Sequence, residues 1–307
     1  MKQKEFDDII KANLLEYGEH GGKKYKQSDF GYRKGEYENY FEKNFFDNFV
    51  QTNKLPAYKG DELNEKGKRP PKMASVGSSS RFCYLALKDW AENKENGIEF
   101  EKECTIDGIS GMAPQLDAYI AKGNIYIEAK CHEIFTPHSI IMSTAYKNML
   151  CENFGLKDKD LGKTTVNRKR KNPKYKKGEN PTVDEYIKVP VEMLKIKPEL
   201  FKVNKEETMF DIKQFLCHLS GIASSKKGRA KLVYMFFKPL YANTELNTVF
   251  TELEAEIKAI FESDPVKAFC NKNEIELCAI VQEANVMTKL VDTPNENYKY
   301  LYPKTKS

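Results

Sequence analysis

Apolar and polar residues alternate along two neighbouring runs between positions 115 and 131, and this period of two predicts a pair of β-strands. Gly123 lies between the runs, at a point where the sequence is typical of a hairpin turn. If the loop holds two or four residues, Asp117 faces Glu128 across the hairpin, and both share one face of the sheet with Lys130. A three-residue loop without a bulge would instead put the two acids on different faces.

Two carboxylates that face each other across a hairpin have Cβ atoms ~4.5–5.5 Å apart and normally destabilise a sheet. A hard divalent cation turns this repulsion into binding, because Mg²⁺ prefers oxygen ligands and often takes only one or two carboxylates. Lys130 follows Glu128 on the same face and is placed to hold or polarise an attacking water. Asp117, Glu128 and Lys130 are therefore candidate catalytic residues for metal-assisted phosphodiester hydrolysis. A surface hairpin whose charged side chains are solvated is the alternative.

The spacing of these residues resembles the PD-(D/E)xK nuclease superfamily, and more narrowly the bacterial proteins classed as type II restriction endonucleases. Asp117 is followed eleven positions later by Glu128, Ala129 and Lys130, and two residues separate Asp117 from the preceding Pro114. The resemblance implies that Asp117 and Glu128 bind Mg²⁺, or Mn²⁺ in its place. It also implies that the Ala129 carbonyl is a further metal ligand and that Lys130 positions the water.

The order of the predicted elements is typical of an α/β (α+β) fold in which helices flank a mixed β-sheet. The resemblance implies a restriction-endonuclease-like core of the same kind. We expect an N-terminal helical extension and connector over 1–74, and a nuclease core over 75–292. A basic insertion without a predicted helix or strand interrupts the core at about 155–207, and a C-terminal tail covers 293–307. The predicted helices are 6–17, 36–50, 81–95, 138–154, 209–223 and 246–263, and the predicted strands are 99–106, 115–121, 125–131, 231–238 and 274–282.

The helix predicted at 209–223 carries Gln214 and His218 on one face, because helical residues four apart are neighbours. By resemblance, a polar residue on the helix after the Glu-x-Lys strand faces the active site. Gln214 is the first candidate for this catalytic role and His218 the second; a helix with a polar outer face is the alternative. Glu101 and Glu103 share one face of the strand predicted at 99–106 and are candidates for an outer carboxylate; solvated strand positions are the alternative there.

The net charge is +5, and the positive charge is concentrated between residues 157 and 177, which hold ten Lys or Arg against two Asp. Such a run suits a polyanion, because each phosphate contact releases counterions and adds affinity. Four consecutive residues, Arg168, Lys169, Arg170 and Lys171, are candidate DNA contacts. A solvated loop is the alternative.

A run of serines precedes the helix predicted at 81–95. Free amides at a helix N-terminus can bind a DNA phosphate, and a guanidinium lies close by. Ser79, Ser80 and Arg81 are therefore further candidate DNA contacts. Helix capping alone also explains the serines.

The sequence argues against membrane and secreted classes. No run reaches the ~18 apolar residues of a membrane span, and the N-terminal residues lack the apolar segment of a signal peptide. We therefore expect a cytoplasmic protein. Its seven cysteines include no Cys-x-x-Cys pair and lie mostly in apolar runs, which indicates reduced core thiols rather than disulfides or a zinc site.

These features predict a Mg²⁺-dependent endodeoxyribonuclease that acts on double-stranded DNA, of the type II restriction endonuclease kind. A homodimer would match a palindromic site, and a restriction enzyme implies a companion methyltransferase. The alternatives are a DNA repair, recombination or structure-specific nuclease with the same site, a nuclease acting on RNA, and a non-catalytic DNA-binding protein whose acids are incidental.

Overall fold

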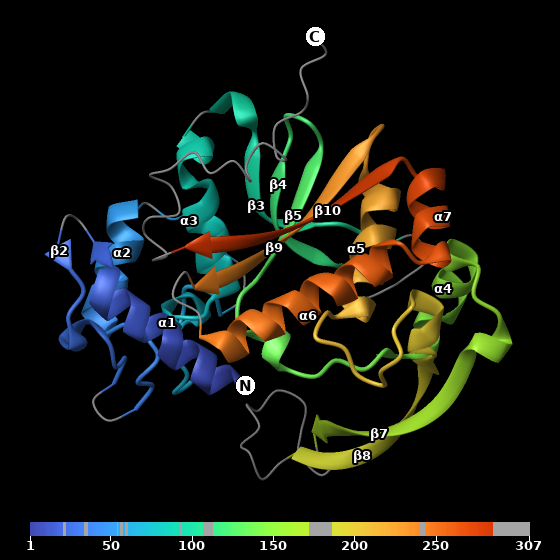
Figure 1. Ribbon diagram of the computed structural model, residues 1–307, viewed down its shortest axis with the longest axis horizontal. Helices are drawn as coiled ribbons and strands as arrows, with labels where there is room; N and C mark the ends of the chain where they lie inside the picture. Colours follow the sequence, from blue (N-terminus) through green and yellow to red (C-terminus); the bar gives the residue numbers. More distant parts are fainter. Residues whose placement is uncertain are drawn as a thin grey trace.

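A five-stranded mixed sheet in the order β10-β9-β5-β4-β3 lies at the centre of the computed structural model, with helices around it (Figure 1). The structure describes residues 1–20, 23–33, 36–53, 55, 58, 61–92, 94–106, 113–171, 186–239 and 243–284. The helices are α1 (Gln3–Tyr17), α2 (Lys43–Asn53), α3 (Ser79–Glu92), α4 (Lys147–Phe154), α5 (Ile212–Ser225), α6 (Thr244–Phe261) and α7 (Asp264–Lys272). The strands are β1 (Glu19–His20), β2 (Lys23–Lys24), β3 (Ile98–Glu103), β4 (Gln115–Ile120), β5 (Ile125–Lys130), β6 (Ile141–Met142), β7 (Leu161–Lys171), β8 (Tyr186–Ile196), β9 (Ala230–Pro239) and β10 (Ile275–Ala284).

The central sheet combines two kinds of pairing. Strands β5, β9 and β10 run parallel, whereas β3, β4 and β5 are antiparallel neighbours. Parallel neighbours need long crossovers, and α6 and α7 lie in the chain between β9 and β10. β9 is almost wholly buried, which explains why its sequence is a near-continuous apolar run rather than an alternating one. This architecture agrees with the predicted α+β class.

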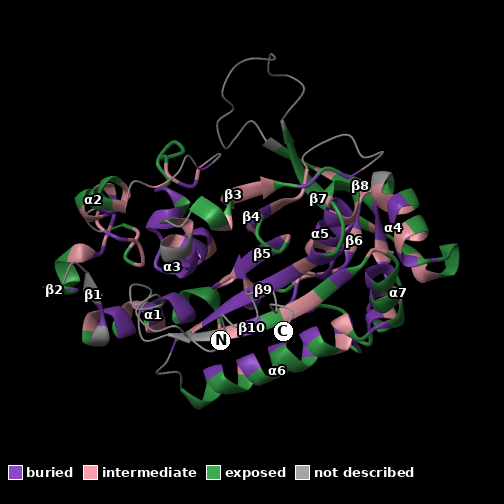
Figure 2. Cartoon of the chain, turned by 90° about the horizontal axis from the view of Figure 1, so that it is seen from above, coloured by how far each residue is buried: buried purple, intermediate pink, exposed green. Residues whose placement is uncertain are grey.

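Alternate residues of β9 point to opposite faces of the sheet and meet different helices. Phe237 packs against Phe82 of α3, with ring centroids 5.4 Å apart. Tyr234 packs against Phe215 of α5, with ring centroids 5.9 Å apart. Helix α3 therefore covers one face and α5 the other, and Figure 2 shows β5 and β9 buried within the molecule.

The N-terminal segment packs on the same hydrophobic core. Phe6 of α1 is fully buried, and its ring centroid lies 4.7 Å from that of Phe135, in the segment after β5. Oδ1 of Asp7 lies 2.9 Å from Nδ1 of His132, a residue that follows the end of β5. Helix α1 is thereby fixed beside the end of the strand that carries Glu128.

The region 155–207 differs from the prediction, because it contains regular structure. β7 and β8 pair antiparallel from Leu161 and Ile196 to Lys171 and Tyr186, and β6 pairs with the other edge of β8. Many side chains of this ribbon are exposed on both of its faces. A strand exposed on both faces lacks the alternation of apolar and polar residues that would identify it in the sequence.

Two predicted helices are wrong in extent. Only the last part of the helix predicted at 138–154 is α-helical, as α4. Among the earlier residues, His138 pairs with Thr208 and β6 pairs with β8, so these positions are extended. The helix predicted at 36–50 begins at Lys43, and α7 is absent from the prediction. The predicted tail, 293–307, lies outside the described residues. Within the described part of the chain, no helix has the length and apolar character to cross a membrane.

Candidate active site

The β4–β5 hairpin has the register that a four-residue loop predicts. Gly123, with φ of 104°, lies in this loop, and the pairing extends as far as Ala118 and Ile127. The next two residues along the strands are Asp117 and Glu128. The register therefore brings the two acids of the predicted site to the same level of the sheet.

The main-chain pairing of β4 with β5 ends at Ala118. At the next residue, the Asp117 side chain takes the place of a main-chain hydrogen-bond partner for β5. Its Oδ2 accepts a hydrogen bond from the backbone N–H of Ala129 at 2.7 Å. In an antiparallel ladder the N–H and C=O of one residue point to the same neighbouring strand. The Ala129 carbonyl therefore also points toward β4, which is the side on which Asp117 lies.

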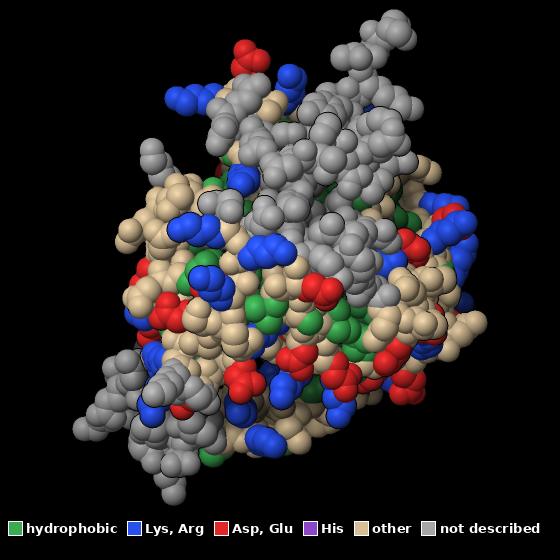
Figure 3. All heavy atoms as spheres, turned by 60° about the vertical axis from the view of Figure 1, so that its left-hand side comes forward, with side chains coloured by type: hydrophobic (Ala, Val, Ile, Leu, Met, Phe, Trp, Pro, Cys, Tyr) green, Lys and Arg blue, Asp and Glu red, His purple; other side chains and the backbone are tan. Residues whose placement is uncertain are grey.

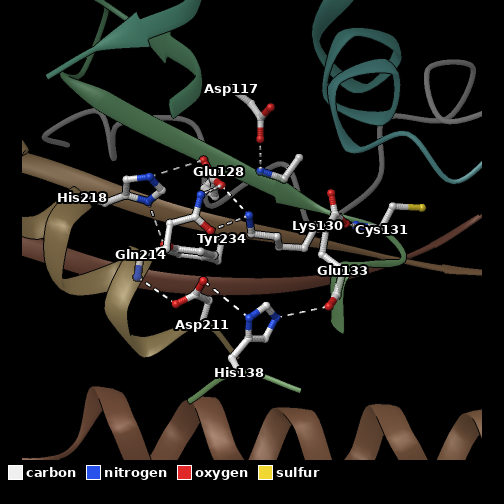
Figure 4. A network of polar contacts seen from close by, with 11 residues as sticks. Asp117, Glu128, Lys130, Cys131, Glu133, His138, Asp211, Gln214, His218 and Tyr234 are labelled. Atoms are coloured by element: carbon white, nitrogen blue, oxygen red, sulfur yellow. Dashed lines mark hydrogen bonds and ion pairs between the residues drawn. The ribbon is translucent and has the colours of Figure 1, made fainter. Parts of the chain in front are cut away.

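Glu128, Lys130 and Gln214 form a closed set of polar contacts (Figure 4). The Lys130 ammonium donates to Oε1 of Glu128 at 2.6 Å and to Oε1 of Gln214 at 2.8 Å. Nε2 of Gln214 donates to the same Glu128 oxygen at 3.1 Å. Asp211 caps α5 by accepting a hydrogen bond from the Gln214 backbone at 2.9 Å, which fixes the first turn of the helix. Gln214 thus lies where the resemblance places it.

A buried histidine lies beside the second oxygen of Glu128. Nε2 of His218 is 3.9 Å from Oε2 of Glu128, and its Nδ1 is 2.8 Å from the Tyr234 hydroxyl. Burial lowers the pKa of His218, and this effect exceeds the opposing effect of the Glu128 carboxylate. His218 is therefore neutral at physiological pH. His218 is buried and 3.9 Å is too long for a hydrogen bond, so it borders Glu128 from the protein interior and does not contact a substrate.

A cavity of about 500 Å³ opens over these groups. Asp117, Glu128, Lys130 and Gln214 all line it. Its other charged lining residues come from β3 and from the segment before α3; they are Glu101, Glu103, Asp61, Glu62 and Lys72.

Three of these residues, Asp61, Glu62 and Lys72, are missed by the sequence reasoning, which treats their segment as a connector. The Lys72 ammonium lies 3.0 Å from Asp61 and 2.9 Å from Glu62. The segment has no periodicity that would fix where its side chains point, so no sequence signal places them at the cavity. Glu101 and Glu103, by contrast, both line the cavity, which is the position that an outer carboxylate would need.

The site disturbs the titration of its charged groups. Burial, together with the neighbouring Glu128 carboxylate, raises the pKa of Asp117 well above its usual range, although Lys130 opposes this. Burial acts to lower the pKa of Lys130, but the carboxylates of Glu128, Glu133 and Asp117 outweigh it, so that pKa is raised. Lys130 is therefore a permanent cation, suited to orient a water rather than to take its proton. Repulsion between Asp117 and Glu128 favours binding of a cation between them.

The donor set fits a hard divalent cation. Two carboxylates and a carbonyl supply oxygen ligands and leave positions for water and phosphate, as Mg²⁺ prefers. Among the described residues, no group of three or more His, Cys, Asp and Glu side chains is spaced to hold a metal. The oxygen donors of Asp117, Glu128 and Ala129 are of the type that Mg²⁺ or Mn²⁺ accepts, and they are not the thiolate and imidazole ligands typical of zinc.

The residues at the start of α3 divide into two groups. Ser79 and Ser80 line the same cavity as Asp117, so the structure brings both predicted contacts to the candidate site. Ser78 is the capping residue, because its Oγ accepts a hydrogen bond from the Arg81 backbone at 3.2 Å.

Arg81 does not have the position that a DNA contact requires, which corrects the prediction. Its side chain is buried, and its guanidinium donates to the carbonyls of Met73 at 3.2 Å and Val76 at 3.1 Å. The guanidinium also stacks over the Phe41 ring at 4.1 Å. Arg81 therefore holds the N-terminal segment on α3.

The predicted basic contacts lie on the β7–β8 ribbon, away from the residues that line the cavity. Arg168, Lys169 and Arg170 are exposed on β7. Lys171 ends this strand, and its side chain lies outside the described residues. The structure thus brings Asp117, Glu128, Lys130 and Gln214 together and leaves the basic residues as a separate surface.

No family model, curated protein or solved structure matches this chain. Its site is therefore interpreted from its own geometry.

Proposed function

We propose that this chain is a Mg²⁺-dependent endodeoxyribonuclease of the PD-(D/E)xK kind, and specifically a type II restriction endonuclease that acts on double-stranded DNA. One observation carries the proposal. Asp117 and Glu128, from adjoining strands, line a single cavity together with Lys130, and the Ala129 backbone lies directly against Asp117. This combination of oxygen ligands and a fixed ammonium is what metal-assisted phosphodiester hydrolysis needs.

Each residue has a separate task in the proposed reaction. Asp117, Glu128 and the Ala129 carbonyl would hold the cation. A bound divalent cation supplies Lewis-acid stabilisation of the phosphate and lowers the pKa of the attacking water. Lys130 orients that water and offsets the negative charge that develops on the phosphate. Gln214 holds the Lys130 ammonium in place, because its amide oxygen accepts from it at 2.8 Å.

A restriction role implies two partners and a location. A homodimer would place two cavities symmetrically on a palindromic site. A companion methyltransferase would protect the host DNA, and both proteins would act in the cytoplasm.

The experiment that tests this function is digestion of intact plasmid with Mg²⁺, with Mn²⁺ or with EDTA, followed by sequencing of the ends. Discrete fragments whose ends share one sequence would support a restriction enzyme. Preferential cutting of branched or single-stranded DNA would assign the site to a repair, recombination or structure-specific nuclease. Absence of metal-dependent cleavage on every DNA substrate would contradict the proposal and favour a non-catalytic DNA-binding protein.

A further inference from the structure

The β7–β8 ribbon projects from the body of the protein (Figure 1). Its base is fixed, because Met193, Leu194 and Ile196 are buried and β6 pairs with β8. Its distal half, 166–171 paired with 186–191, has no buried residue among its described side chains. A two-stranded ribbon in water is marginally stable at best. The distal half is therefore typical of an element that gains contacts from a partner.

The charge of this distal half has one sign. Arg168, Lys169, Arg170 and Lys188 occupy exposed positions, and the two segments contain no Asp or Glu. Within the described residues, no ion pair joins any of these four side chains to an acid. On the face of the protein that Figure 3 presents, acidic and basic side chains are instead interspersed. The ribbon thus concentrates positive charge that the rest of the described chain does not neutralise.

The ladder itself places like charges together. Lys169 stands directly opposite Lys188 across the two strands. Like charges at directly opposed positions destabilise an antiparallel pair. A polyanion removes this repulsion, because its phosphates bind both ammonium groups. The ribbon is therefore complementary to a nucleic acid rather than to an apolar or cationic partner.

The dimensions and position of the ribbon favour duplex DNA. The major groove of B-DNA is about 12 Å wide and admits a two-stranded ribbon. Six residues at ~3.3 Å each give the distal half a reach of about 20 Å. Only residues 131–140 separate the end of β5 from β6, which pairs with β8. The base of the ribbon is thus tied to the strand that carries Glu128 and Lys130.

We propose that the distal half of the β7–β8 ribbon enters the major groove of the duplex whose phosphodiester is bound at the candidate active site. The inference rests on the nuclease function proposed above and names the element that holds its substrate. Successive side chains of a strand point to opposite faces, so Arg168 and Arg170 share one face and Lys169 lies on the other with Lys188. The arginines contact base edges, where guanidinium groups bind guanine, and the lysines reach the phosphates at the rim of the groove.

The test is binding of a fluorescent DNA duplex of about 30 base pairs in EDTA, measured by anisotropy over a range of salt concentrations. The ribbon variant combines Arg168→Ala, Lys169→Ala, Arg170→Ala and Lys188→Ala. The control variant removes four charges near the β4–β5 turn, at the opposite end of β5: Lys122→Ala, Lys226→Ala, Lys227→Ala and Arg229→Ala.

We expect the ribbon variant to bind at least ~10-fold more weakly and to have a salt slope shallower by about 2, since each of the two lysine–phosphate contacts contributes ~0.9. The control variant should keep the wild-type slope. Equal losses in the two variants would overturn the inference. A change of oligomeric mass in the ribbon variant would also overturn it, because the ribbon would then be an arm between two copies of this chain.

A second measurement uses wild-type protein and an RNA duplex of the same sequence. The major groove of A-form RNA is deep and narrow and excludes side chains, so the DNA duplex should bind more tightly. Equal binding of the two duplexes would contradict insertion into the groove. Both readouts need no cleavage, so a failure of the proposed nuclease activity is distinguishable from a failure of this inference.

Discussion

The ammonium nitrogen of Lys130 lies 2.6 Å from Oε1 of Glu128, and only 13% and 5% of the two side chains are exposed. Burial of an ion pair costs the desolvation of both charges, so such a pair is weak evidence for stability. It persists where further hydrogen bonds satisfy it, and the Gln214 amide provides bonds to both partners. Perturbed, buried charges beside a cavity are typical of functional sites. The pair is therefore the kind of preset charge arrangement that the proposed reaction needs beside its cavity.

Lys130→Met should abolish most of the DNA cleavage. The substitution keeps the length of the side chain but removes the charge that orients the water, and loss of one such group costs about 10²–10³-fold in rate. The measurement is the single-turnover cleavage rate at saturating Mg²⁺. Lys102→Met is the matched control, because Lys102 on β3 pairs with Glu99 and does not line the cavity. A wild-type rate in the Lys130 variant would exclude the assigned role.

Asp117→Asn should stabilise the metal-free protein as the pH rises. The pKa of Asp117 is raised in the folded state, so the fold favours the protonated form. The unfolded state then binds fewer protons, and the stability of the wild type falls as the pH increases from the usual Asp range through the raised value. The neutral Asn avoids this loss and still accepts from the Ala129 N–H. Thermal melts should therefore show a gain of a few degrees that is larger at neutral than at acidic pH.

With Mg²⁺ present, the wild type should become more stable than Asp117→Asn. The cation binds the ionised Asp117 carboxyl of the wild type and has no such ligand in the variant. Asp158→Asn, at an exposed position paired with Lys147, controls for the loss of one surface charge. A variant that is destabilised without metal, or stabilised by Mg²⁺ as strongly as the wild type, would count against the assigned ligand.

Tyr234→Phe should weaken metal binding without touching a metal ligand. The Tyr234 hydroxyl holds His218, which lies 3.9 Å from Glu128, so its removal leaves the histidine and the carboxylate less well oriented. Loss of a partner hydrogen-bonded to a metal ligand typically costs ~10–100-fold in affinity; because His218 only neighbours Glu128, we expect a rise at or below about 10-fold in the Mg²⁺ concentration for half-maximal cleavage. Tyr84→Phe removes a hydrogen bond to the Asn53 carbonyl on the opposite face of the sheet and should leave this midpoint unchanged.

Gly77→Ala should destabilise the fold where α1 meets the end of β5. A Cβ at this position would overlap Oδ1 of Asp7 and lie 2.5 Å from Nδ1 of His132. Overpacking of this kind costs about 1–3 kcal/mol, which denaturant unfolding would detect. Gly162→Ala on β7 is the control, since its nearest contact would be an ordinary 3.5 Å from the Lys195 carbonyl. Equal stability of the two variants would show that the Asp7 and His132 side chains move aside at little cost in free energy.

The elements of the site that follow a regular period are readable from the sequence. The alternation along β4 and β5 sets the register, and the register alone brings Asp117 level with Glu128. The spacing of four along α5 places Gln214 and His218 on one face, and both reach Glu128. The period is a local property and needs no tertiary information, whereas the sequence leaves the loop length open and the structure fixes it at four residues.

The remaining parts depend on tertiary packing and could not be predicted. Glu62 reaches the cavity from a segment without periodicity, where nothing local fixes the direction of a side chain. Arg81 has the sequence context of a phosphate contact. Its guanidinium is instead buried, where it stacks on Phe41 and donates hydrogen bonds to two backbone carbonyls. The strands β7 and β8 are defined by pairing with each other, and their exposed faces leave no hydrophobic pattern.

The central claim is that Asp117 and Glu128 hold one divalent cation, and metal-directed cleavage of the protein backbone tests it most directly. Fe²⁺ with ascorbate and peroxide generates radicals that cut the chain beside the bound metal, and mass spectrometry locates the cuts. We expect cuts next to Asp117 and Glu128 that excess Mg²⁺ suppresses and that Glu128→Gln removes. Cuts at other positions, or cuts that Mg²⁺ does not suppress, would contradict the claim.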